Sequence, residues 1–235
     1  IESGRTLGSF YLGGIDHGNR EWRNQDFNLN KTDYEDIRKK IGMRDEVEVK
    51  DLYEKLSNNQ VVIAIAPTGT GKSTYLPFVL LEPINQTDAS AKSLNINGSS
   101  TPYRRDHFTA NGPILVSQPR VGAATNIAKA VAGKLYGTPI GPGYLIGYKI
   151  GKQQKQAGKE KQIEDCYDRF TKLIYITDGS LMNWLSAGKA HEQSIIIIDE
   201  AHERSVNIDV ILMLLKRELV KYPHLKLIIT SATID

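Results

Sequence analysis

Two short groups of polar residues, each placed directly after a run of apolar residues, carry side chains suited to phosphate chemistry. The first is a glycine-rich turn that ends in Lys72 and Ser73. The backbone N–H groups of such a turn wrap a polyphosphate, the lysine reaches the terminal phosphates and the hydroxyl holds Mg²⁺. The second group is the acidic pair Asp199 and Glu200, which follows four isoleucines. A carboxylate opposite a phosphate loop is the second half of a nucleotide-hydrolysis site.

The pattern assigns each of these residues a role. The expected nucleotide contacts are Thr68, Gly69, Thr70, Gly71, Lys72, Ser73 and Thr74. Asp199 would help Ser73 to hold Mg²⁺, in its case through water, and Glu200 would orient the attacking water and accept its proton. An acidic pair after a strand can also cap the next helix, and the upstream phosphate loop favours the catalytic interpretation. One departure is Ala66, because the strict loop pattern begins with glycine.

Apolar, mostly β-branched runs must form the strands that position these groups. Residues 61–65 predict a short buried strand, since the run is too short for a helix and is followed by Pro and Gly. Further strands are expected at 114–116, 144–150, 173–176, 195–198 and 225–230. Helices are expected at 46–56, from Lys72 to Leu81, at 123–135, from Leu181, and from Asn207 or Asp209 to Val220.

Strands that alternate with helices predict an α/β fold. Its sheet is expected to be mostly parallel, with helices on both faces. Each polar group follows the carboxyl end of a strand, and ligands bind at that edge of open α/β sheets. We therefore expect the glycine-rich turn and the acidic pair to lie at one site.

Composition limits the classes of protein. Of the 235 residues, 40% are hydrophobic and 24% are charged, which is ordinary for a globular protein. The net charge of +3 is compatible with a nucleic-acid partner without requiring one. The single cysteine, Cys166, cannot form an internal disulfide, and neither a secretory signal nor an apolar run of membrane-spanning length is visible. These features predict an intracellular protein, cytoplasmic or nuclear, with no membrane segment.

Two stretches depart from the α/β pattern. Residues 1–45 predict an N-terminal extension or linker, because their first part shows no sustained period and is rich in turn residues. Residues from about 83 to 113 are polar and predict a mobile insertion. The chain begins at Ile1, and we expect it to be a piece of a longer polypeptide.

Five motifs in order resemble the first RecA-like lobe of superfamily 2 helicases of the DEAH/RHA group. Motif I is the loop at 66–74, where alanine at the first position is common in that superfamily. Motif II is the sequence DEAH at 199–202, extended by Glu-Arg-Ser as in the family. The other three are Ser117-Gln118-Pro119-Arg120, Thr177-Asp178-Gly179 and Ser231-Ala232-Thr233. Val121 stands where the family usually has a second arginine, which puts one backbone contact in doubt.

The resemblance implies a P-loop NTPase fold over 46–235 and an enzyme that hydrolyses ATP or another NTP with Mg²⁺. Its partner would be single-stranded nucleic acid, with RNA favoured. The residues implied to contact that strand, through phosphate and sugar, are Arg120, Thr177, Asp178 and Gly179. Ser231 and Thr233 would couple the two sites with His202 as their partner. A second RecA-like lobe, absent here, would supply arginines for hydrolysis, so the isolated chain is expected to be weakly active or inactive.

Two other functions stay open at this point. A DNA helicase or duplex translocase of the same superfamily has the same loop and acidic pair. A nucleotide-binding clamp without catalysis is disfavoured by the presence of Lys72, Ser73, Asp199 and Glu200 together. The sequence fits a cellular or a viral source.

Overall fold

The computed structural model describes residues 5–6, 28–29, 46–67, 69–81, 112–133, 139–151, 165–169 and 171–232. The N-terminal extension and the insertion at 83–113 therefore lie almost wholly outside the described residues, as do Thr68 and Thr233. Within the N-terminal segment, β1 (Arg5–Thr6) pairs antiparallel with β2 (Asn28–Leu29).

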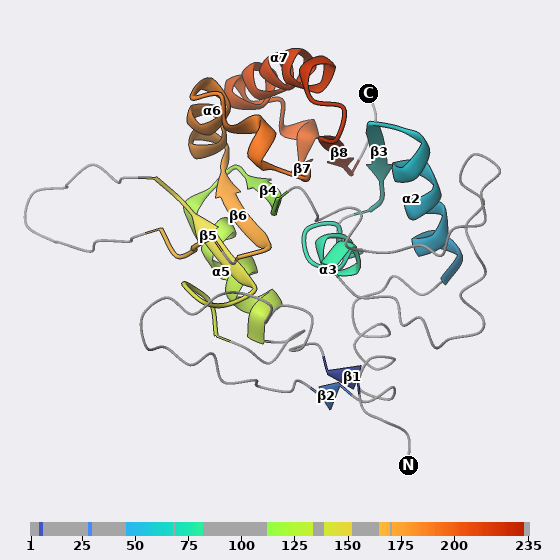
Figure 1. Ribbon diagram of the computed structural model, residues 1–235, viewed down its shortest axis with the longest axis vertical. Coiled ribbons are helices and arrows are strands. Elements are labelled where there is room, and N and C mark those ends of the chain that lie inside the picture. The colour runs from blue at the N-terminus through green and yellow to red at the C-terminus, as the bar shows by residue number, and fades with distance from the viewer. Residues whose placement is uncertain are drawn as a thin grey trace, which may run out of the picture.

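The centre of the structure is a six-stranded sheet with the order β3-β8-β7-β4-β6-β5 (Figure 1). Its strands are β3 (Val61–Ile65), β4 (Ile114–Gln118), β5 (Ile146–Lys149), β6 (Leu173–Thr177), β7 (Ile195–Ile198) and β8 (Lys226–Ser231). Every neighbouring pair is parallel, so all carboxyl ends lie at one edge. The predicted α/β fold with a parallel sheet is confirmed, and the acidic pair follows an interior strand.

Helices cover both faces of this sheet. They are α2 (Glu46–Asn58), α3 (Tyr75–Leu81), α5 (Val121–Val131), α6 (Asp178–Ser186) and α7 (Val206–Lys221), with short 3₁₀ turns η3 (Lys189–Glu192) and η4 (Ala201–Glu203). The helices expected within the described residues form, with boundaries that move by a few residues, and a helix expected from Thr32-Asp33 to about Lys40 lies outside those residues. Helix α6 begins at Asp178 instead of Leu181, so part of the motif expected to contact nucleic acid is the first turn of a helix.

Successive side chains of β7 point to opposite faces of the sheet and pack into two separate apolar layers. Ile195 and Ile197 pack in the layer formed with α2, α3 and α5, whereas Ile196 and Ile198 pack in the layer formed with α6 and α7. All four side chains are fully buried, as a strand covered on both faces requires. Figure 1 shows α6 and α7 together on one side of the sheet and α3 and α5 on the other.

The prediction that residues 61–65 form a buried strand is wrong for one face of that strand. β3 lies at an edge of the sheet, and the side chains of Val61, Ile63 and Ile65 are 42%, 58% and 52% exposed. Val62, on the opposite face, is only 7% exposed. A run of uniformly apolar residues predicts a strand but does not tell whether helices reach both of its faces.

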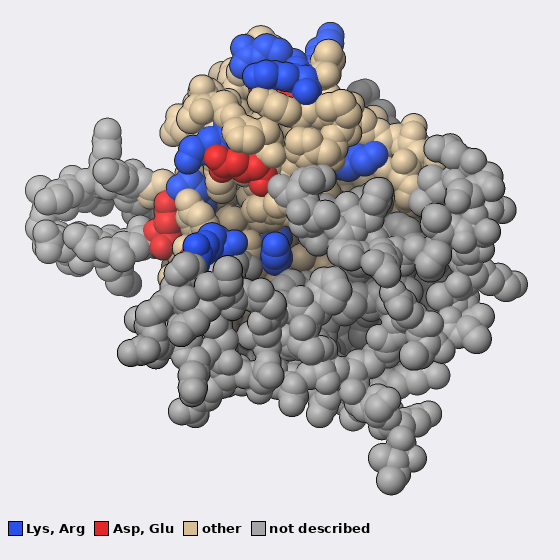
Figure 2. All heavy atoms as spheres, in the orientation of Figure 1, with Lys and Arg blue, Asp and Glu red and all other residues tan. Residues whose placement is uncertain are grey.

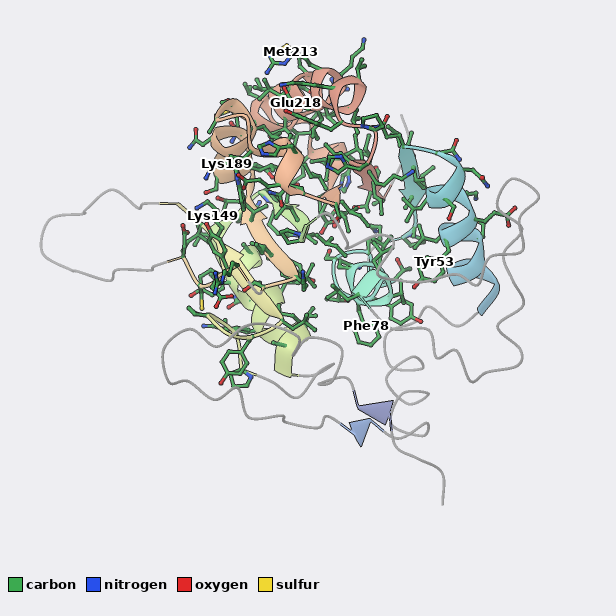
Figure 3. The ribbon with its side chains drawn as sticks, in the orientation of Figure 1. Tyr53, Phe78, Lys149, Lys189, Met213 and Glu218 are labelled. Carbon is green, nitrogen blue, oxygen red and sulfur yellow. The ribbon has the colours of Figure 1, made fainter. Side chains whose placement is uncertain are left out.

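Side chains from α2 fix α3 against β3. Tyr53 of α2 is buried, and its hydroxyl donates a hydrogen bond to the backbone carbonyl of Val79 in α3. Figure 3 shows Tyr53 beside Phe78, on the side of the molecule where α2 and α3 meet. All residues of α3 are buried, so the helix that follows the glycine-rich turn is firmly held. No helix in the described part of the chain is long and apolar enough to cross a membrane.

Candidate nucleotide-binding site

The glycine-rich turn closes by local contacts. Gly69 and Gly71 have φ angles of 84° and 91°, which only glycine adopts readily. The hydroxyl of Thr70 donates to the backbone carbonyl of Pro67 at 2.8 Å. The carbonyl of Gly71 accepts N–H groups from the first turn of the following helix, including that of Tyr75 at 2.7 Å. The turn therefore leads directly into α3.

The backbone N–H groups of residues 69–73 have no acceptor among the residues that the structure describes. Backbone donors in a protein are almost always paired, and a run of unpaired donors before a helix is the arrangement that binds an anion. The turn therefore has the backbone arrangement that the sequence predicts for a phosphate-binding loop.

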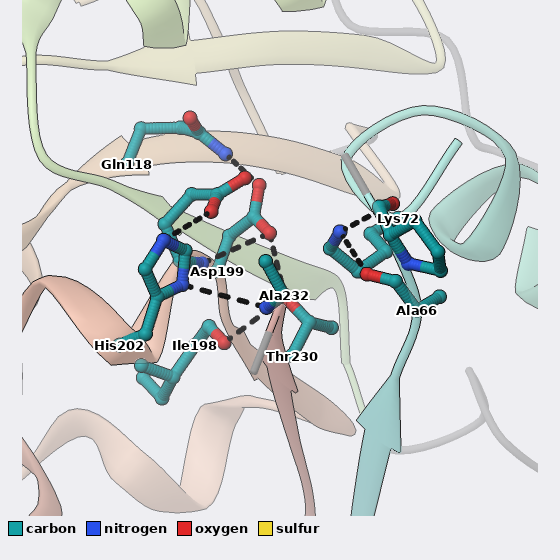
Figure 4. A network of polar contacts seen from close by, with 10 residues as sticks. Ala66, Lys72, Gln118, Ile198, Asp199, His202, Thr230 and Ala232 are labelled. Carbon is teal, nitrogen blue, oxygen red and sulfur yellow. Dashed lines mark hydrogen bonds and ion pairs between the residues drawn. The ribbon is translucent and has the colours of Figure 1, made fainter. Parts of the chain in front are cut away.

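Lys72 lies within the loop that it is expected to serve. Its side chain is 7% exposed, and its Nζ atom donates to the carbonyls of Ala66 at 2.6 Å and Pro67 at 2.9 Å (Figure 4). These neutral acceptors satisfy two of the three donors of the ammonium group. A phosphate oxygen, which carries negative charge, is a stronger acceptor for the same group.

The acidic pair is fixed by contacts from other strands. Asp199 is fully buried. One of its carboxylate oxygens accepts from the Gln118 side chain at 2.7 Å, and the other accepts from the Thr230 hydroxyl at 2.6 Å. Gln118 is the last residue of β4, and Thr230 lies near the end of β8. The two strands that flank β7 therefore hold this carboxylate from both sides.

The backbone after Asp199 turns through an uncommon conformation. Glu200 and Arg204 have φ angles of 53° and 47°, and they are the non-glycine residues with positive φ in the described part of the chain. Such residues cost free energy and cluster at functional sites. The turn leaves the Glu200 carboxylate partly exposed, with one oxygen 3.4 Å from Nε2 of His202.

The end of β8 joins the phosphate loop to the acidic turn. The N–H of Ala66 donates to the carbonyl of Ser231 at 3.2 Å, on the loop side. On the other side the N–H of Ala232 donates to Nδ1 of His202 at 3.5 Å, and Thr230 binds Asp199 (Figure 4). The predicted loop, acidic pair and coupling motif are thus brought together. The contact with His202 comes from the backbone of Ala232, and Thr233 lies outside the described residues.

A tyrosine in β6 forms a second connection to the loop. Tyr175 is fully buried, and its hydroxyl donates to the backbone carbonyl of Ser73 at 2.8 Å. Burial, and to a lesser extent the charge of Asp199, raise the pKa of Tyr175 well above its ordinary range. The phenol therefore stays protonated and acts as a donor.

The residues expected to contact nucleic acid differ in their exposure. Arg120 is exposed at the start of α5. Thr177 and Asp178 are 8% and 3% exposed, and the Thr177 hydroxyl lies 2.9 Å from that of Ser180. Burial is the main cause that raises the pKa of Asp178 to about 6, and Glu203 and Asp199 add to the shift. Gly179, in the first turn of α6, is half-buried, so it is more accessible to a nucleic-acid strand than the side chains of Thr177 and Asp178 are.

Surface charge alone does not trace a path for nucleic acid. On the face shown in Figure 2, the described lysine and arginine side chains stand in separate groups, with neutral and acidic side chains between them. The candidate path is defined by the ends of β4 and β6, where Arg120 and Gly179 lie, and not by a continuous basic stripe.

Sequence reasoning assigned no role to three residues that shape the site. Gln118 and Thr230 bind Asp199, and Tyr175 binds the loop. Gln118 lies within a recognised motif, and its place as the last residue of a strand could have identified it. The other two are strand residues, and no local pattern distinguishes them from core residues.

The oxygen donors of the site fit Mg²⁺. The Ser73 hydroxyl and the Asp199 carboxylate are hard ligands of the kind that this ion prefers. Because Gln118, Thr230 and the N–H of Glu200 already donate to the two Asp199 oxygens, the carboxylate suits contact with Mg²⁺ through water better than direct ligation. Mg²⁺ commonly keeps several waters in phosphate sites.

Comparisons with known proteins agree with this geometry. A profile of the DEAD/DEAH box helicase family matches residues 49–235. The chain is 35% identical over 186 residues to a protein of Borreliella burgdorferi named ATP-dependent RNA helicase HrpA. The aligned region covers 79% of this chain and 18% of the HrpA protein. It is also similar to the crystal structure of the Escherichia coli DEAH/RHA helicase HrpB, with a TM-score of 0.58, 28% identity, and coverage of 80% of this chain and 20% of that one.

The chain spans about a fifth of the length of both relatives. The matched region contains the phosphate loop, the acidic turn and the sheet that carries them. Because the family profile covers most of the chain and its motifs meet at one edge of the sheet, the chain belongs to the DEAD/DEAH box helicase family.

Proposed function

We propose that this chain is the nucleotide-binding lobe of an ATP-dependent RNA helicase, which couples NTP hydrolysis to movement along single-stranded RNA. The observation that carries this proposal is the end of β8, which contacts the phosphate loop through Ser231 and the acidic turn through Thr230. One strand end thereby touches the two halves of a hydrolysis site. The similarity to proteins named as RNA helicases supports RNA as the nucleic acid.

The loop residues would bind the nucleotide. The unpaired N–H groups of residues 69–73 donate to the phosphates, and Lys72 exchanges the carbonyls of Ala66 and Pro67 for phosphate oxygens. Ser73 and Asp199 are the residues that would hold Mg²⁺. When bound, that ion neutralises charge that develops on the phosphates during hydrolysis.

Glu200 would act on the attacking water. Its carboxylate is partly exposed, whereas the neighbouring Asp199 is fully buried and accepts hydrogen bonds from three donors. The exposed carboxylate is therefore the one free to accept a proton, and Asp199 keeps a fixed position. His202 lies between Glu200 and the backbone of Ala232, so movement of either one would reach the other.

Contact with RNA is assigned to the turns after β4 and β6. Arg120 is exposed there and would bind a backbone phosphate, while the turn at Thr177, Asp178 and Gly179 offers the N-terminal N–H groups of α6. Contacts of this kind depend on salt and not on base sequence. Arg120→Ala is expected to weaken binding equally for different RNA sequences.

The hydrolysis test uses a longer protein that contains both lobes, with and without RNA. We expect single-stranded RNA to stimulate hydrolysis more than single-stranded DNA does. Stronger stimulation by DNA would favour the DNA helicase, and no hydrolysis with either would favour a silent clamp. Glu200→Gln is the control, since it should retain nucleotide binding and lose hydrolysis.

The isolated chain is expected to hydrolyse ATP slowly. An arginine that stabilises the transferring phosphoryl group can contribute roughly a thousandfold in rate, and the family resemblance assigns that arginine to the second lobe. Single-turnover hydrolysis by the isolated chain, compared with the longer protein, measures this difference. Equal rates would contradict the assignment.

A further inference from the structure

The first turn of the helix after the phosphate loop has a backbone acceptor with no helical donor. In a continuous helix, the carbonyl of Ser73 would accept the N–H of residue 77. That residue is Pro77, which has no N–H. The helix continues past it, because the N–H of Phe78 donates to the carbonyl of Thr74 at 3.2 Å. The carbonyl of Ser73, the serine that would hold Mg²⁺, therefore receives no N–H from residue 77.

Tyr175 fills this gap from a different element. Its hydroxyl donates to the Ser73 carbonyl at 2.8 Å, across a sequence separation of 102 residues. The phenol is fully buried in the sheet, where its ring cannot leave without opening the core. The donor that proline removes from the helix is thus supplied by a rigid side chain of β6.

We propose that Tyr175 is a positioning residue for the Mg²⁺-nucleotide site: it holds the Ser73 backbone where the serine hydroxyl can bind the metal. The proposal rests on the nucleotide-binding function proposed above and adds a determinant outside the loop. The two residues are complementary, because Pro77 has no N–H to donate to the Ser73 carbonyl and Tyr175 supplies the missing donor.

The hydrogen bond from Tyr175 to Ser73 also joins the loop to the turn at Thr177, Asp178 and Gly179, which is proposed to contact RNA. Tyr175 precedes Thr177 by two residues on β6, and α6 begins at Asp178. A displacement of the end of β6 by bound nucleic acid would therefore reach the Ser73 carbonyl through a single side chain. The route differs from the one through β8 and His202, which leads to the acidic turn.

The first test is Tyr175→Phe, which removes one oxygen atom and keeps the ring. Nucleotide affinity of the full chain is measured by titration calorimetry with ATP, once with Mg²⁺ and once with EDTA. We expect a loss of about three- to tenfold with Mg²⁺, the range for one hydrogen bond, and less than about twofold with EDTA. A purely structural effect would weaken binding equally under both conditions.

Tyr53→Phe is the matched control. It removes a second tyrosine hydroxyl that donates to a backbone carbonyl of the same helix, that of Val79. This carbonyl lies beyond the loop. The variant is expected to lower the melting temperature and to leave Mg²⁺-dependent affinity unchanged. An equal loss of Mg²⁺-dependent affinity in both variants would overturn the proposal.

The second test restores the missing donor within the helix. In the double variant Pro77→Ala/Tyr175→Phe, the new N–H of residue 77 can donate to the Ser73 carbonyl. We expect this variant to recover most of the Mg²⁺-dependent affinity, whereas Pro77→Ala alone should bind as the unaltered chain does. Failure of the double variant to recover, with its fold intact by circular dichroism, would overturn the proposal.

The outcomes separate this inference from the proposed function. If the unaltered chain binds Mg²⁺-ATP, Lys72→Ala abolishes binding and Tyr175→Phe binds normally, the inference fails and the nucleotide site stands. If the unaltered chain does not bind Mg²⁺-ATP, both fail. Selective loss in Tyr175→Phe together with recovery in the double variant supports the inference.

Discussion

The phosphate loop and the acidic turn are built in opposite ways. The loop follows β3, an edge strand with one exposed face, and most of its hydrogen bonds join residues within six positions of each other. The acidic turn follows β7, which is covered on both faces, and Asp199 is bound by residues 81 and 31 positions away. The loop is therefore locally determined, and the position of the carboxylate depends on the whole sheet.

This difference indicates where each half of the site can change shape. A loop closed by its own carbonyls can exchange them for phosphate without disturbing the core. A carboxylate held by two neighbouring strands cannot move unless those strands do. Ser231 connects the loop to β8, the strand that also binds Asp199, whereas Tyr175 connects the loop to β6.

Loss of the loop lysine should remove function without unfolding the chain. Lys72→Ala is expected to weaken ATP binding by about a hundredfold or more, because the charged donor to the phosphates is lost, while the melting temperature changes little. Calorimetry and circular dichroism measure the two effects. Lys55→Ala, which removes an exposed lysine paired with Asp51 on α2, is the control and should bind normally. Unchanged binding by Lys72→Ala would refute the site assignment.

The same change from isoleucine to alanine should destabilise the fold more in β7 than in β3. Ile197→Ala in β7 is expected to lower the free energy of unfolding by about 2–5 kcal/mol, since it leaves a cavity in a fully buried layer. Ile63→Ala in β3 should cost less than about 1 kcal/mol, because its side chain is 58% exposed. Urea denaturation measures both values. Similar costs would mean that the exposed face of β3 is covered in solution.

The two donors to Asp199 should each contribute to stability. Gln118→Ala leaves one buried Asp199 oxygen without its donor, which costs about 1–3 kcal/mol. Thr230→Val leaves the other oxygen with the N–H of Glu200 alone, so it should cost less than Gln118→Ala. Thr125→Val removes a hydroxyl that bonds only within α5, and it should cost less than either. Denaturant midpoints of the three variants make the comparison. If Thr125→Val lowers the free energy of unfolding most, the hydrogen bonds around Asp199 do not hold that carboxylate rigidly in place.

The protonation of Asp178 should make the stability of the fold depend on pH. Its pKa rises from 3.8 to about 6 on folding, mainly through burial. Between these two values the unfolded chain loses the proton while the folded chain keeps it, so this residue makes stability fall as pH rises from about 4 to about 6. Below that window the effect disappears, and above it the full penalty remains. Asp178→Asn should remove this part of the slope, which denaturant midpoints at several pH values would show. Parallel pH profiles would contradict the assignment.

Much of the fold could be predicted because its signals are local. Each apolar run formed a strand, and the α/β alternation allowed few arrangements other than a parallel sheet. The helix boundaries were less accurate, as at α6, because helix ends depend on how the chain enters from the preceding strand. Burial of β3 was predicted wrongly, since the position of a strand within the sheet is not encoded in its own residues.

The residues proposed to act on the nucleotide could be found from the sequence because they are close together in the chain. Gly69, Gly71, Lys72 and Ser73 lie within five consecutive positions, so chain connectivity alone brings them together, and the acidic pair is adjacent in the same way. The residues that hold those groups in place are known only from the tertiary structure. Gln118, Thr230 and Tyr175 reach the site from separate strands, and the parallel order of the sheet brings their side chains within hydrogen-bond distance. Residues far apart in the chain become neighbours through strand order, which no local pattern records.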